Sequence, residues 1–349
     1  RSASGNGMTA SRGNSERLRI GIIGGGAITQ VAHLPVLKKV KTIEVRAICD
    51  TDLPKARALA DRFAVKDAFD DIEELLRYED LDAVVICSPN HLHEAHILAA
   101  LSANLHVLVE KPLSMSAASA ARIVKAAEKH GKVVMVGMNH RYRPDVQIVR
   151  SFVQSGELGT VESVRGSWHV FRPSRNQLGW RQRRDLAGGG AMLDLGLSIL
   201  DLGLWLGGNP KPSRVSAHLD SPGKDRSVEK SGSAFVVCEN GMSLFVDVTW
   251  HHLGEGERFG VGVRGTKGIG AINPLVVWKE LHGVPVDVSP TGSGSRENPF
   301  TASYRAEWAH FEAAVAGEAR VPSLEEHVVL HKIIDAIYKS AADGRDVTL

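Results

Sequence analysis

Between Leu18 and Asn139, short apolar runs alternate with segments of helical composition. The runs are LRIGIIG, IEVRAICD, DAVVICSP, LHVLVEKP and KVVMVGMN. Continuous apolar strands separated by helices indicate a parallel sheet that is covered on both faces. Crossover connections of this kind are right-handed, so we expect a doubly wound α/β fold over residues 18–139.

After about residue 140 the pattern changes to longer strand-like runs, preceded by a helical piece at 146–157. The runs are TVESVRGSWHV, SRVSAHLD, GSAFVVCEN, GMSLFVDVTW and RFGVGVRG, and the Asn-Gly pair in CENGMS is typical of a hairpin turn. An apolar helix at 188–206 is available to cover one face of these strands. We therefore expect residues 140–349 to form a second, α+β domain with mostly antiparallel strands.

Composition limits the partners of the chain. Its 349 residues carry 42 Lys and Arg against 40 Asp and Glu, without long basic runs, so we expect neither nucleic acid nor a membrane surface as a partner. The three cysteines form no Cys-x-x-Cys pair, which favours a reducing compartment and a cytoplasmic protein. Residues 1–17 are polar and rich in Gly and Ser, and we expect a disordered arm or an artificial extension there.

A glycine-rich turn, GGGAIT at residues 24–29, follows the first predicted strand. Gly24 and Gly26 fit the first two positions of G-x-G-x-x-G/A, where the backbone approaches a pyrophosphate, and Thr29 stands at the third position. A strand before the turn and a helix after it are the context that dinucleotide binding requires. We therefore expect Gly24, Gly26, Ala27 and Ile28 to contact a dinucleotide.

Asp50 ends the second predicted strand. An acid at this place accepts hydrogen bonds from the ribose hydroxyls of NAD and repels the 2′-phosphate of NADP. The alternative is an ordinary acid at the end of a strand. Because no arginine stands between Asp50 and Lys55, we predict NAD as the cofactor.

A Glu-Lys pair, Glu110 and Lys111, ends the fourth predicted strand. Ligands bind at the carboxyl edge of such a sheet, so Lys111 is a candidate for acid–base work beside a positively charged nicotinamide. Taken alone, it also fits a solvated turn.

The apolar stretch 188–206 carries three polar side chains that a regular helix would bring within roughly 60° of one another. They are Asp194, Ser198 and Asp201. A buried carboxylate costs several kcal/mol unless it finds partners. The acids therefore either cap a helix or pair with an arginine, or the stripe faces a reaction site.

Six motifs in order resemble the glucose–fructose oxidoreductase/inositol dehydrogenase (Gfo/Idh/MocA) family. They are GIIGGGAITQVAHLPVL, AICDTD, CSPNHLH, VEKPLS, GMNHRYRP and GGGAMLDLGLSILDLGLWL, and the resemblance covers residues 18–349. It implies a Rossmann domain followed by an α/β domain with an open, largely antiparallel sheet. It also implies an NAD-dependent dehydrogenase acting on sugars, cyclitols or related polyols.

Matching positions carry the family's residue roles to this chain. Lys111 matches the lysine that contacts substrate beside the nicotinamide. Asp194 matches the acid of an Asp-x-Gly-x-His motif, and Lys111 and Asp194 are the expected catalytic pair. The resemblance and the strand pattern together assign the cofactor to Gly24, Gly26, Ala27, Ile28, Asp50, Ser88, Pro89, Asn90, His93, Glu110, Lys111 and Asn139.

The family's motif has a histidine where this chain has Ser198, and a serine hydroxyl is too weak a base to replace it. Three interpretations remain. Lys111, oriented by Asp194, handles the proton; another histidine (His169, His251 or His252) enters the site; or the chain binds NAD without oxidising an alcohol. The residues expected near the substrate are Lys111, His169, Arg172, Asp194, Ser198 and His252.

We therefore predict a hydride transfer between nicotinamide and a hydroxyl-bearing carbon of a sugar, glycoside or cyclitol. The alternatives are a redox-neutral glycosidase or epimerase that works through a transient keto-sugar, and a non-catalytic NAD- or sugar-binding protein. No clear metal-ligand set is present, because His93 and His96 share a helical face that His91 does not. Apolar runs such as SLFVDVTW on the second sheet, together with the resemblance, predict a homodimer or homotetramer.

Overall fold

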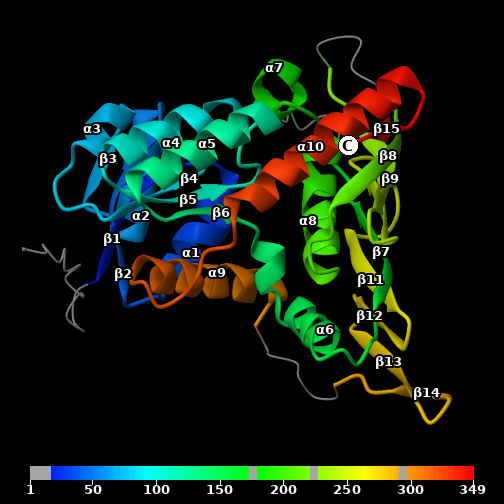
Figure 1. Cartoon of the computed structure of the whole chain (residues 1–349). Helices are drawn as coiled ribbons and strands as arrows, with labels where there is room; N and C mark the ends of the chain where they lie inside the picture. The colour runs from blue at the N-terminus through cyan, green and yellow to red at the C-terminus, as the bar shows by residue number, and fades with distance from the viewer. Residues whose placement is uncertain (1–16, 173–178, 221–226, 291–296) are drawn as a thin grey trace, which may run out of the picture.

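The computed structural model describes residues 17–172, 179–220, 227–290 and 297–349 and contains two sheets side by side (Figure 1). The first is a six-stranded parallel sheet in the order β3-β2-β1-β4-β5-β6. This order confirms the doubly wound fold. Its strands are β1 (Leu18–Ile23), β2 (Ile43–Cys49), β3 (Asp67–Phe69), β4 (Ala83–Ile86), β5 (His106–Glu110) and β6 (Val134–Gly137).

Burial and capping explain where these elements form. All four residues of β4 are buried, as expected for a central strand covered on both faces. Helix α2 (Leu53–Phe63) begins where the Asp52 side chain accepts a hydrogen bond from the backbone N–H of Lys55, and it ends at Ala64 in the left-handed conformation. Helix α5 (Ala117–His130) likewise begins at a Ser116 cap and ends at Gly131.

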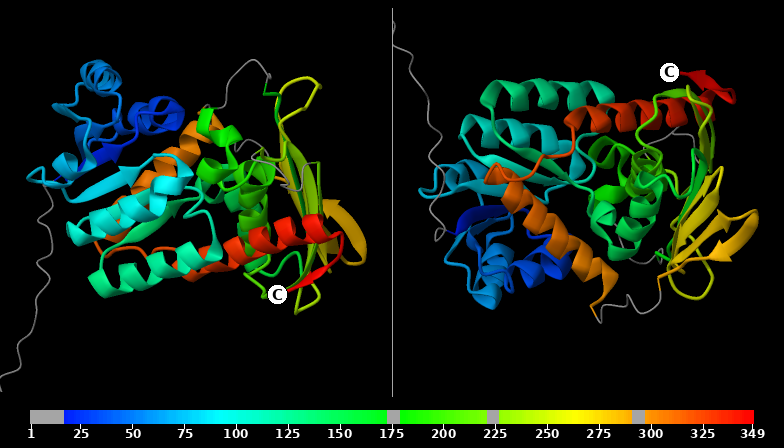
Figure 2. Two further views of the ribbon diagram at one scale, coloured as in Figure 1. Left: turned by 90° about the horizontal axis from the view of Figure 1, so that it is seen from above. Right: turned by 60° about the horizontal axis from the view of Figure 1, so that its bottom comes forward.

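Helices cover both faces of the parallel sheet. Helix α4 (His93–Ser102) packs beside α5 on one face, and α1 (Leu34–Leu37) and α2 lie on the other; the short α3 (Ile72–Leu76) contacts β2 and β3. Helix α9 (Pro299–Val315) comes from the far end of the chain and places Trp308 and Phe311 in the core of the α1 face (Figure 2). The division of the chain at residue 140 stays a prediction, because α9 shares the core of the first sheet.

The second sheet has nine strands in the order β14-β13-β12-β11-β7-β10-β9-β8-β15. All of its pairs are antiparallel except β7 with β10, which confirms a largely antiparallel second domain. The Asn-Gly hairpin joins β9 to β10, with Gly241 at φ +85°. The strands are β7 (Val161–His169), β8 (Pro212–Leu219), β9 (Ser231–Cys238), β10 (Ser243–Thr249), β11 (Arg258–Gly265), β12 (Gly268–Ile272), β13 (Val276–Leu281), β14 (Val284–Asp287) and β15 (Val347–Thr348).

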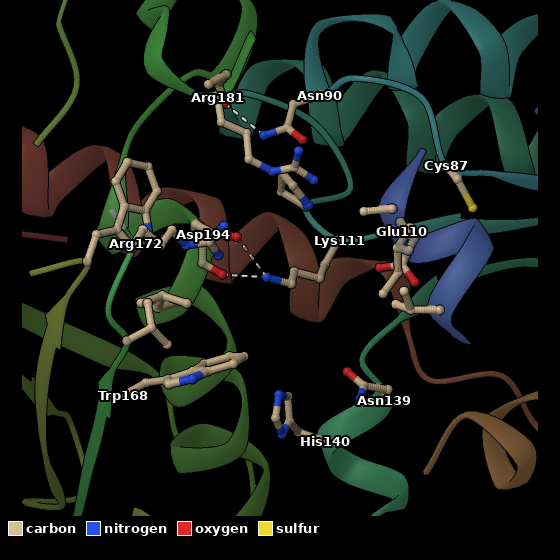
Figure 3. A pocket seen from close by; sticks show the side chains of 18 of the residues that line it. Cys87, Asn90, Glu110, Lys111, Asn139, His140, Trp168, Arg172, Arg181 and Asp194 are labelled. Atoms are coloured by element: carbon tan, nitrogen blue, oxygen red, sulfur yellow. Dashed lines mark hydrogen bonds and ion pairs between the residues drawn. The ribbon is translucent and has the colours of Figure 1, made fainter. Parts of the chain in front are cut away.

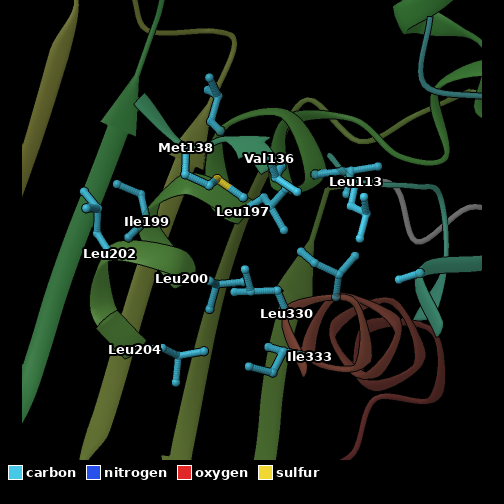
Figure 4. Packing of buried hydrophobic residues seen from close by; sticks show 14 of the residues in the cluster. Leu113, Val136, Met138, Leu197, Ile199, Leu200, Leu202, Leu204, Leu330 and Ile333 are labelled. Carbon is cyan, nitrogen blue, oxygen red and sulfur yellow. The ribbon is translucent and has the colours of Figure 1, made fainter. Parts of the chain in front are cut away.

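One hydrophobic core joins the two sheets. Helix α8 (Leu197–Leu206) packs on the inner face of the second sheet, and α10 (Leu324–Asp343) runs from the first sheet to the second (Figure 1). Leu200 of α8 meets Leu330 and Ile333 of α10 in a cluster that also includes Val136 and Met138 (Figure 4). The stretch Arg184–Leu206 has the length and hydropathy of a membrane span, but 89% of it is buried inside the fold, as in a core helix.

The remaining helical pieces lie in the connections between strands of both sheets. They are the π-helical η1 (Thr29–His33) and η5 (Met192–Gly196), the 3-10 turns η2 (Asn90–Leu92), η3 (Asn139–Tyr142) and η4 (Gly179–Gln182), and the α-helices α6 (Pro144–Gln154) and α7 (Arg184–Ala187). The π-helical turn η5 leads directly into α8.

Candidate active site

The glycine turn after β1 lies against the end of β4. Gly24 has φ +101°, and a Cβ there would lie 2.7 Å from the backbone of Cys87, so this position requires glycine. At Gly26, by contrast, a Cβ would meet nothing within 4 Å, which leaves the backbone open to a ligand. Thr29 is fully buried and donates to the Gly24 carbonyl at 2.5 Å, which explains a hydroxyl residue at the third motif position.

Asp50, at the end of β2, is held beside this turn. Its carboxylate accepts hydrogen bonds from the backbone N–H of Gly25 at 2.8 Å and of Asp52 at 2.9 Å, and it pairs with Lys55 Nζ at 2.8 Å. Burial alone would raise its pKa, but the Lys55 and backbone contacts outweigh burial and keep the pKa below the usual value. Asp50 is thus an ionised acceptor next to an open glycine backbone, which fits a dinucleotide ribose.

A cavity of about 570 Å³ opens between the carboxyl ends of β4, β5 and β6 and the second sheet (Figure 3). Ten of the predicted site residues line it, whereas Gly24, Gly26, Asp50, Pro89, His169, Ser198 and His252 do not. The ten are Ala27, Ile28, Ser88, Asn90, His93, Glu110, Lys111, Asn139, Arg172 and Asp194.

Lys111 and Asp194 meet in the middle of the cavity (Figure 3). Lys111 Nζ donates to the backbone carbonyl of Asp194 and lies 3.4 Å from Asp194 Oδ1. Asp194 Oδ2 accepts from Arg172 Nη2 at 2.9 Å and from Trp250 Nε1 at 3.1 Å. Burial would raise the pKa of Asp194, but Lys111, Arg172 and Arg181 together hold that pKa below its usual value. The site therefore contains an ionised aspartate that fixes a lysine ammonium.

A second carboxylate, that of Glu229, positions the turn that carries Asp194. Glu229 is fully buried and accepts hydrogen bonds from the backbone N–H of Gly190 and Met192, both at 2.9 Å, and from the Tyr338 hydroxyl at 2.8 Å. A Cβ at Gly190 would collide with the Glu229 carbonyl, so the turn before η5 has no room for a side chain. Glu229 thus holds the first turn of the helix that carries Asp194.

The predicted polar stripe does not exist as a stripe. Asp194 lines the cavity, but Ser198 is 2% exposed and is absent from the cavity lining among the described residues. Asp201 is buried and accepts from Arg141 Nε at 2.8 Å, while Arg141 also bonds Glu326. Asp201 therefore pairs with an arginine, as one of the two interpretations of the stripe expected, and the role of Ser198 near the substrate stays a prediction.

The predicted extra histidines also lie outside the cavity. His169 of β7 contacts Asp247 Oδ2 at 2.7 Å through Nε2, and Asp247 in turn accepts from Ser233. His252 lies 5.7 Å from His169, measured between ring centroids. Neither ring borders the cavity among the described residues, and nor does His251, so the expectation that one of them replaces the missing base stays a prediction without support from the cavity lining.

The loops after β4, β5 and β6 are held by protein contacts. Both ring nitrogens of His93 contact carbonyl oxygens, those of Pro112 at 2.7 Å and Ser88 at 2.9 Å. Asn90 Nδ2 donates to the Ala187 carbonyl at 2.8 Å, and Asn139 Nδ2 donates to Ser303 Oγ at 3.1 Å. These bonds tie the first sheet to the second domain and to α9 at the rim of the cavity.

Glu110 also lines the cavity, and its carboxylate is held by contacts with His33 and Tyr304. His33 Nε2 lies 2.9 Å from Glu110 Oε1, and the Tyr304 hydroxyl donates to that oxygen at 3.3 Å. Burial would raise the pKa of Glu110, but the contacts with His33, Lys111 and Tyr304 keep it lowered. Glu110 therefore stays ionised next to Lys111.

Sequence reasoning missed several cavity residues that come from distant parts of the chain. No local pattern links them, although His140 stands directly after the predicted Asn139. They are His140, Arg143, Arg181, Glu257, Phe300 and Tyr304; the tryptophans Trp168, Trp180 and Trp250 also line the cavity.

Comparison with known proteins places the chain in a family. Residues 18–138 match the family model "Oxidoreductase family, NAD-binding Rossmann fold", and residues 146–269 match the "GFO/IDH/MocA C-terminal domain". The chain therefore belongs to the Gfo/Idh/MocA oxidoreductase family. It is an oxidoreductase with an NAD-binding Rossmann domain.

Several curated relatives match over nearly the whole chain, and two of them are named dehydrogenases. D-glucoside 3-dehydrogenase of Escherichia coli is 27% identical over 96% of this chain and 98% of its own. D-xylose 1-dehydrogenase (NADP(+)) 2 of Haloferax volcanii is 32% identical over 95% of this chain and 100% of its own.

Solved structures agree with this fold. GenD2 from gentamicin A biosynthesis, solved with NAD, superposes with a TM-score of 0.82 at 27% identity and covers 98% of this chain and 99% of its own. Levoglucosan dehydrogenase with NADH and levoglucosan superposes with a TM-score of 0.84 at 23% identity, covering 95% and 99%, a likeness of fold.

Proposed function

We propose that this protein is an NAD-dependent dehydrogenase that oxidises a hydroxyl-bearing carbon of a sugar, glycoside or cyclitol. The observation that carries the proposal is the Lys111–Asp194 pair in a cavity at the carboxyl edge of the parallel sheet, the place where such sheets bind ligands. The names of the relatives, glucoside and xylose dehydrogenases, support a carbohydrate substrate.

The residues around Gly26 fit NAD. The open space at Gly26 leaves room for a pyrophosphate beside the backbone, and Asp50 supplies an ionised acceptor for ribose hydroxyls. We assign the same cofactor site to Ala27, Ile28, Ser88, Pro89, Asn90, His93 and Asn139. When bound, NAD supplies the hydride acceptor for the reaction.

Lys111 and Asp194 divide the work on the proton. A lysine ammonium has three N–H donors, and Asp194 accepts from Lys111 through its carbonyl and its carboxylate, so Lys111 keeps a donor for a substrate oxygen. In the reducing direction the Lys111 ammonium delivers a proton to that oxygen, and in the oxidising direction the ammonium first releases a proton to solvent and then takes the hydroxyl proton. Asp194, fixed by Arg172 and Trp250, orients Lys111.

The test is incubation with NAD and a panel of free pyranoses, glycosides and inositols. The proposal predicts NADH formation together with an oxidised sugar, and the Lys111→Met variant is the control, because it keeps the Asp50 site. Release of an aglycone without net NADH would show the redox-neutral alternative. Sugar binding without any turnover would show a non-catalytic binding protein. Either of these results would overturn the proposal.

We also propose that the second sheet mediates a homodimer or homotetramer. Phe235 of β9 and Phe245 of β10 are register partners, 40% and 42% exposed, while their neighbours Val236 and Leu244 are buried on the α8 side. An exposed aromatic pair on the uncovered face of a sheet is a surface that a second copy of the chain would bury through a two-fold contact. A cytoplasmic location stays a prediction.

A further inference from the structure

The proposed function needs groups that recognise the substrate oxygens, and Ser198 lies in the core instead of the cavity. Among the described residues, two histidines line the cavity, His93 and His140. His93 is occupied, because both of its ring nitrogens contact backbone carbonyls. His140 is therefore the imidazole that a ligand can meet.

Three aromatic rings make the wall of the cavity that contains His140. The His140 ring lies 4.9 Å from Trp168 and 4.6 Å from Phe259, measured between centroids. Trp168 Nε1 donates to Glu257 Oε1 at 2.5 Å, which fixes the indole, and Lys111 Nζ lies 5.8 Å from its ring centroid. Figure 3 shows Lys111 and His140 on either side of an open space beside the Trp168 ring.

The ring nitrogens of His140 differ in their surroundings. Nδ1 is buried and has no hydrogen-bond partner, so Nε2 is the nitrogen left for a ligand in the cavity. Burial, then Arg143 and Lys111, lower the pKa of His140 to about 3, so the ring is neutral at physiological pH and carries one N–H. A buried N–H without an acceptor is costlier than a bare nitrogen, which assigns the proton to Nε2.

We propose that His140 is a substrate-binding residue that donates its Nε2–H to an oxygen of the sugar, while the Trp168 ring packs against the apolar face of that sugar. The inference rests on the proposed function and goes further, because it assigns recognition of one substrate oxygen to a residue outside the Lys111–Asp194 pair.

The test compares two replacements of the same ring in the full-length protein. His140→Phe keeps an aromatic ring between Trp168 and Phe259 but removes the donor, and we expect kcat/KM for the sugar to fall by about ten- to a hundredfold. His140→Gln restores an N–H donor near the Nε2 position and is expected to recover part of that loss. NAD affinity, measured by calorimetry, stays unchanged in both variants.

Singly deoxygenated sugars give a readout that mere damage to the fold does not reproduce. For the parent protein, kcat/KM should be lower on one deoxy analogue than on the full sugar, by about the same factor by which His140→Phe lowers kcat/KM on the full sugar. On that analogue, His140→Phe should lower kcat/KM no further. His310→Phe is the matched control, since the His310 ring lies outside the cavity, tilted against Tyr142 with 5.4 Å between the ring centroids.

The outcomes separate the two proposals. A parent protein that turns over no sugar overturns the proposed function. An active parent whose kcat/KM and deoxy-sugar profile are unchanged in His140→Phe overturns the role of His140 alone. If His140→Phe does not fold, His140→Asn takes its place. Its amide lies near Nδ1, so equal activity of the Asn and Gln variants would contradict donation from Nε2.

Discussion

Replacing Glu229 tests how the fold positions Asp194. In Glu229→Ala, the backbone N–H groups of Gly190 and Met192 and the Tyr338 hydroxyl lose their acceptor. Each buried donor left without a partner costs about 1–3 kcal/mol, so the three donors together predict a loss of about 3–9 kcal/mol in the free energy of unfolding. That is a large part of the roughly 5–15 kcal/mol of a typical domain.

Glu229→Gln separates hydrogen bonding from charge. The amide oxygen, placed at the Oε1 position, keeps the three bonds to Gly190, Met192 and Tyr338, whereas the amide nitrogen replaces Oε2 and sets a second donor against the Gly190 N–H, which now contacts Oε2 at 3.0 Å. We expect a cost of about 1–3 kcal/mol, below that of Glu229→Ala, and a cost of about 1 kcal/mol for Tyr338→Phe, which removes a single donor.

The pH dependence of the free energy of unfolding gives a second readout of the role of Glu229. Burial raises the pKa of Glu229, although the hydrogen bonds from Tyr338 and the backbone oppose it. A carboxyl whose pKa is raised in the folded state binds more protons there, so its contribution to stability falls as pH rises above the unfolded-state pKa. The Glu229→Gln side chain does not titrate, so the variant does not lose stability in this way as pH rises. The difference in the free energy of unfolding between the parent protein and Glu229→Gln should therefore narrow from pH 5 to pH 8.

The assay is urea unfolding of the parent, Ala, Gln and Phe variants at both pH values, with kcat/KM for the sugar measured where each variant is folded. The Ala variant should also lose activity, because the turn that carries Asp194 loosens. An Ala variant as stable as the parent, or a Gln variant as damaged as the Ala variant, would refute the role assigned to Glu229.

Three further predictions address stability, cofactor choice and assembly. Burial lowers the pKa of His331 to about 4, so the folded state binds fewer protons than the unfolded state below pH 6.5. This group alone should lower the free energy of unfolding by about 2 kcal/mol at pH 5, and an unfolding midpoint in urea that does not fall between pH 7 and pH 5 would contradict this. Calorimetry should show NAD bound at least tenfold more tightly than NADP, with the gap narrowed in Asp50→Ala, which frees Lys55 for a phosphate; equal binding by the parent would be inconsistent with this assignment. Light scattering should give two or four chains, with weaker association in Phe245→Ser, whereas a monomer of 37.6 kDa at micromolar concentration would argue against assembly through the second sheet.

Much of the fold was predictable because it depends on periodic, local patterns. Continuous apolar runs such as β4 and the Asn-Gly turn between β9 and β10 specify their structures over a few residues. The packing of α9 on the first sheet was not predictable in this way. It depends on Trp308 reaching His33, and nothing in the local sequence links residues so far apart.

The site residues also divide into those that local motifs predict and those whose surroundings come from distant parts of the chain. Lys111 and Asp194 follow from motifs, and the structure brings them together. The burial of Ser198 was not predictable, because whether a polar side chain on an apolar helix borders a cavity or lies in the core depends on what packs against it. His140 was missed because its environment comes from Trp168 and Phe259, on strands of the second sheet.

The central claim is that Lys111, oriented by Asp194, handles the substrate proton. Its most direct test is steady-state sugar oxidation by the parent, Lys111→Met and Ser198→His, with NAD affinity measured alongside. Lys111→Met should lose about 10²–10⁴-fold in turnover while NAD affinity changes little. Ser198→His should gain nothing, because position 198 is packed in the core. Turnover retained by Lys111→Met, or a gain of about a hundredfold in Ser198→His, would contradict the claim.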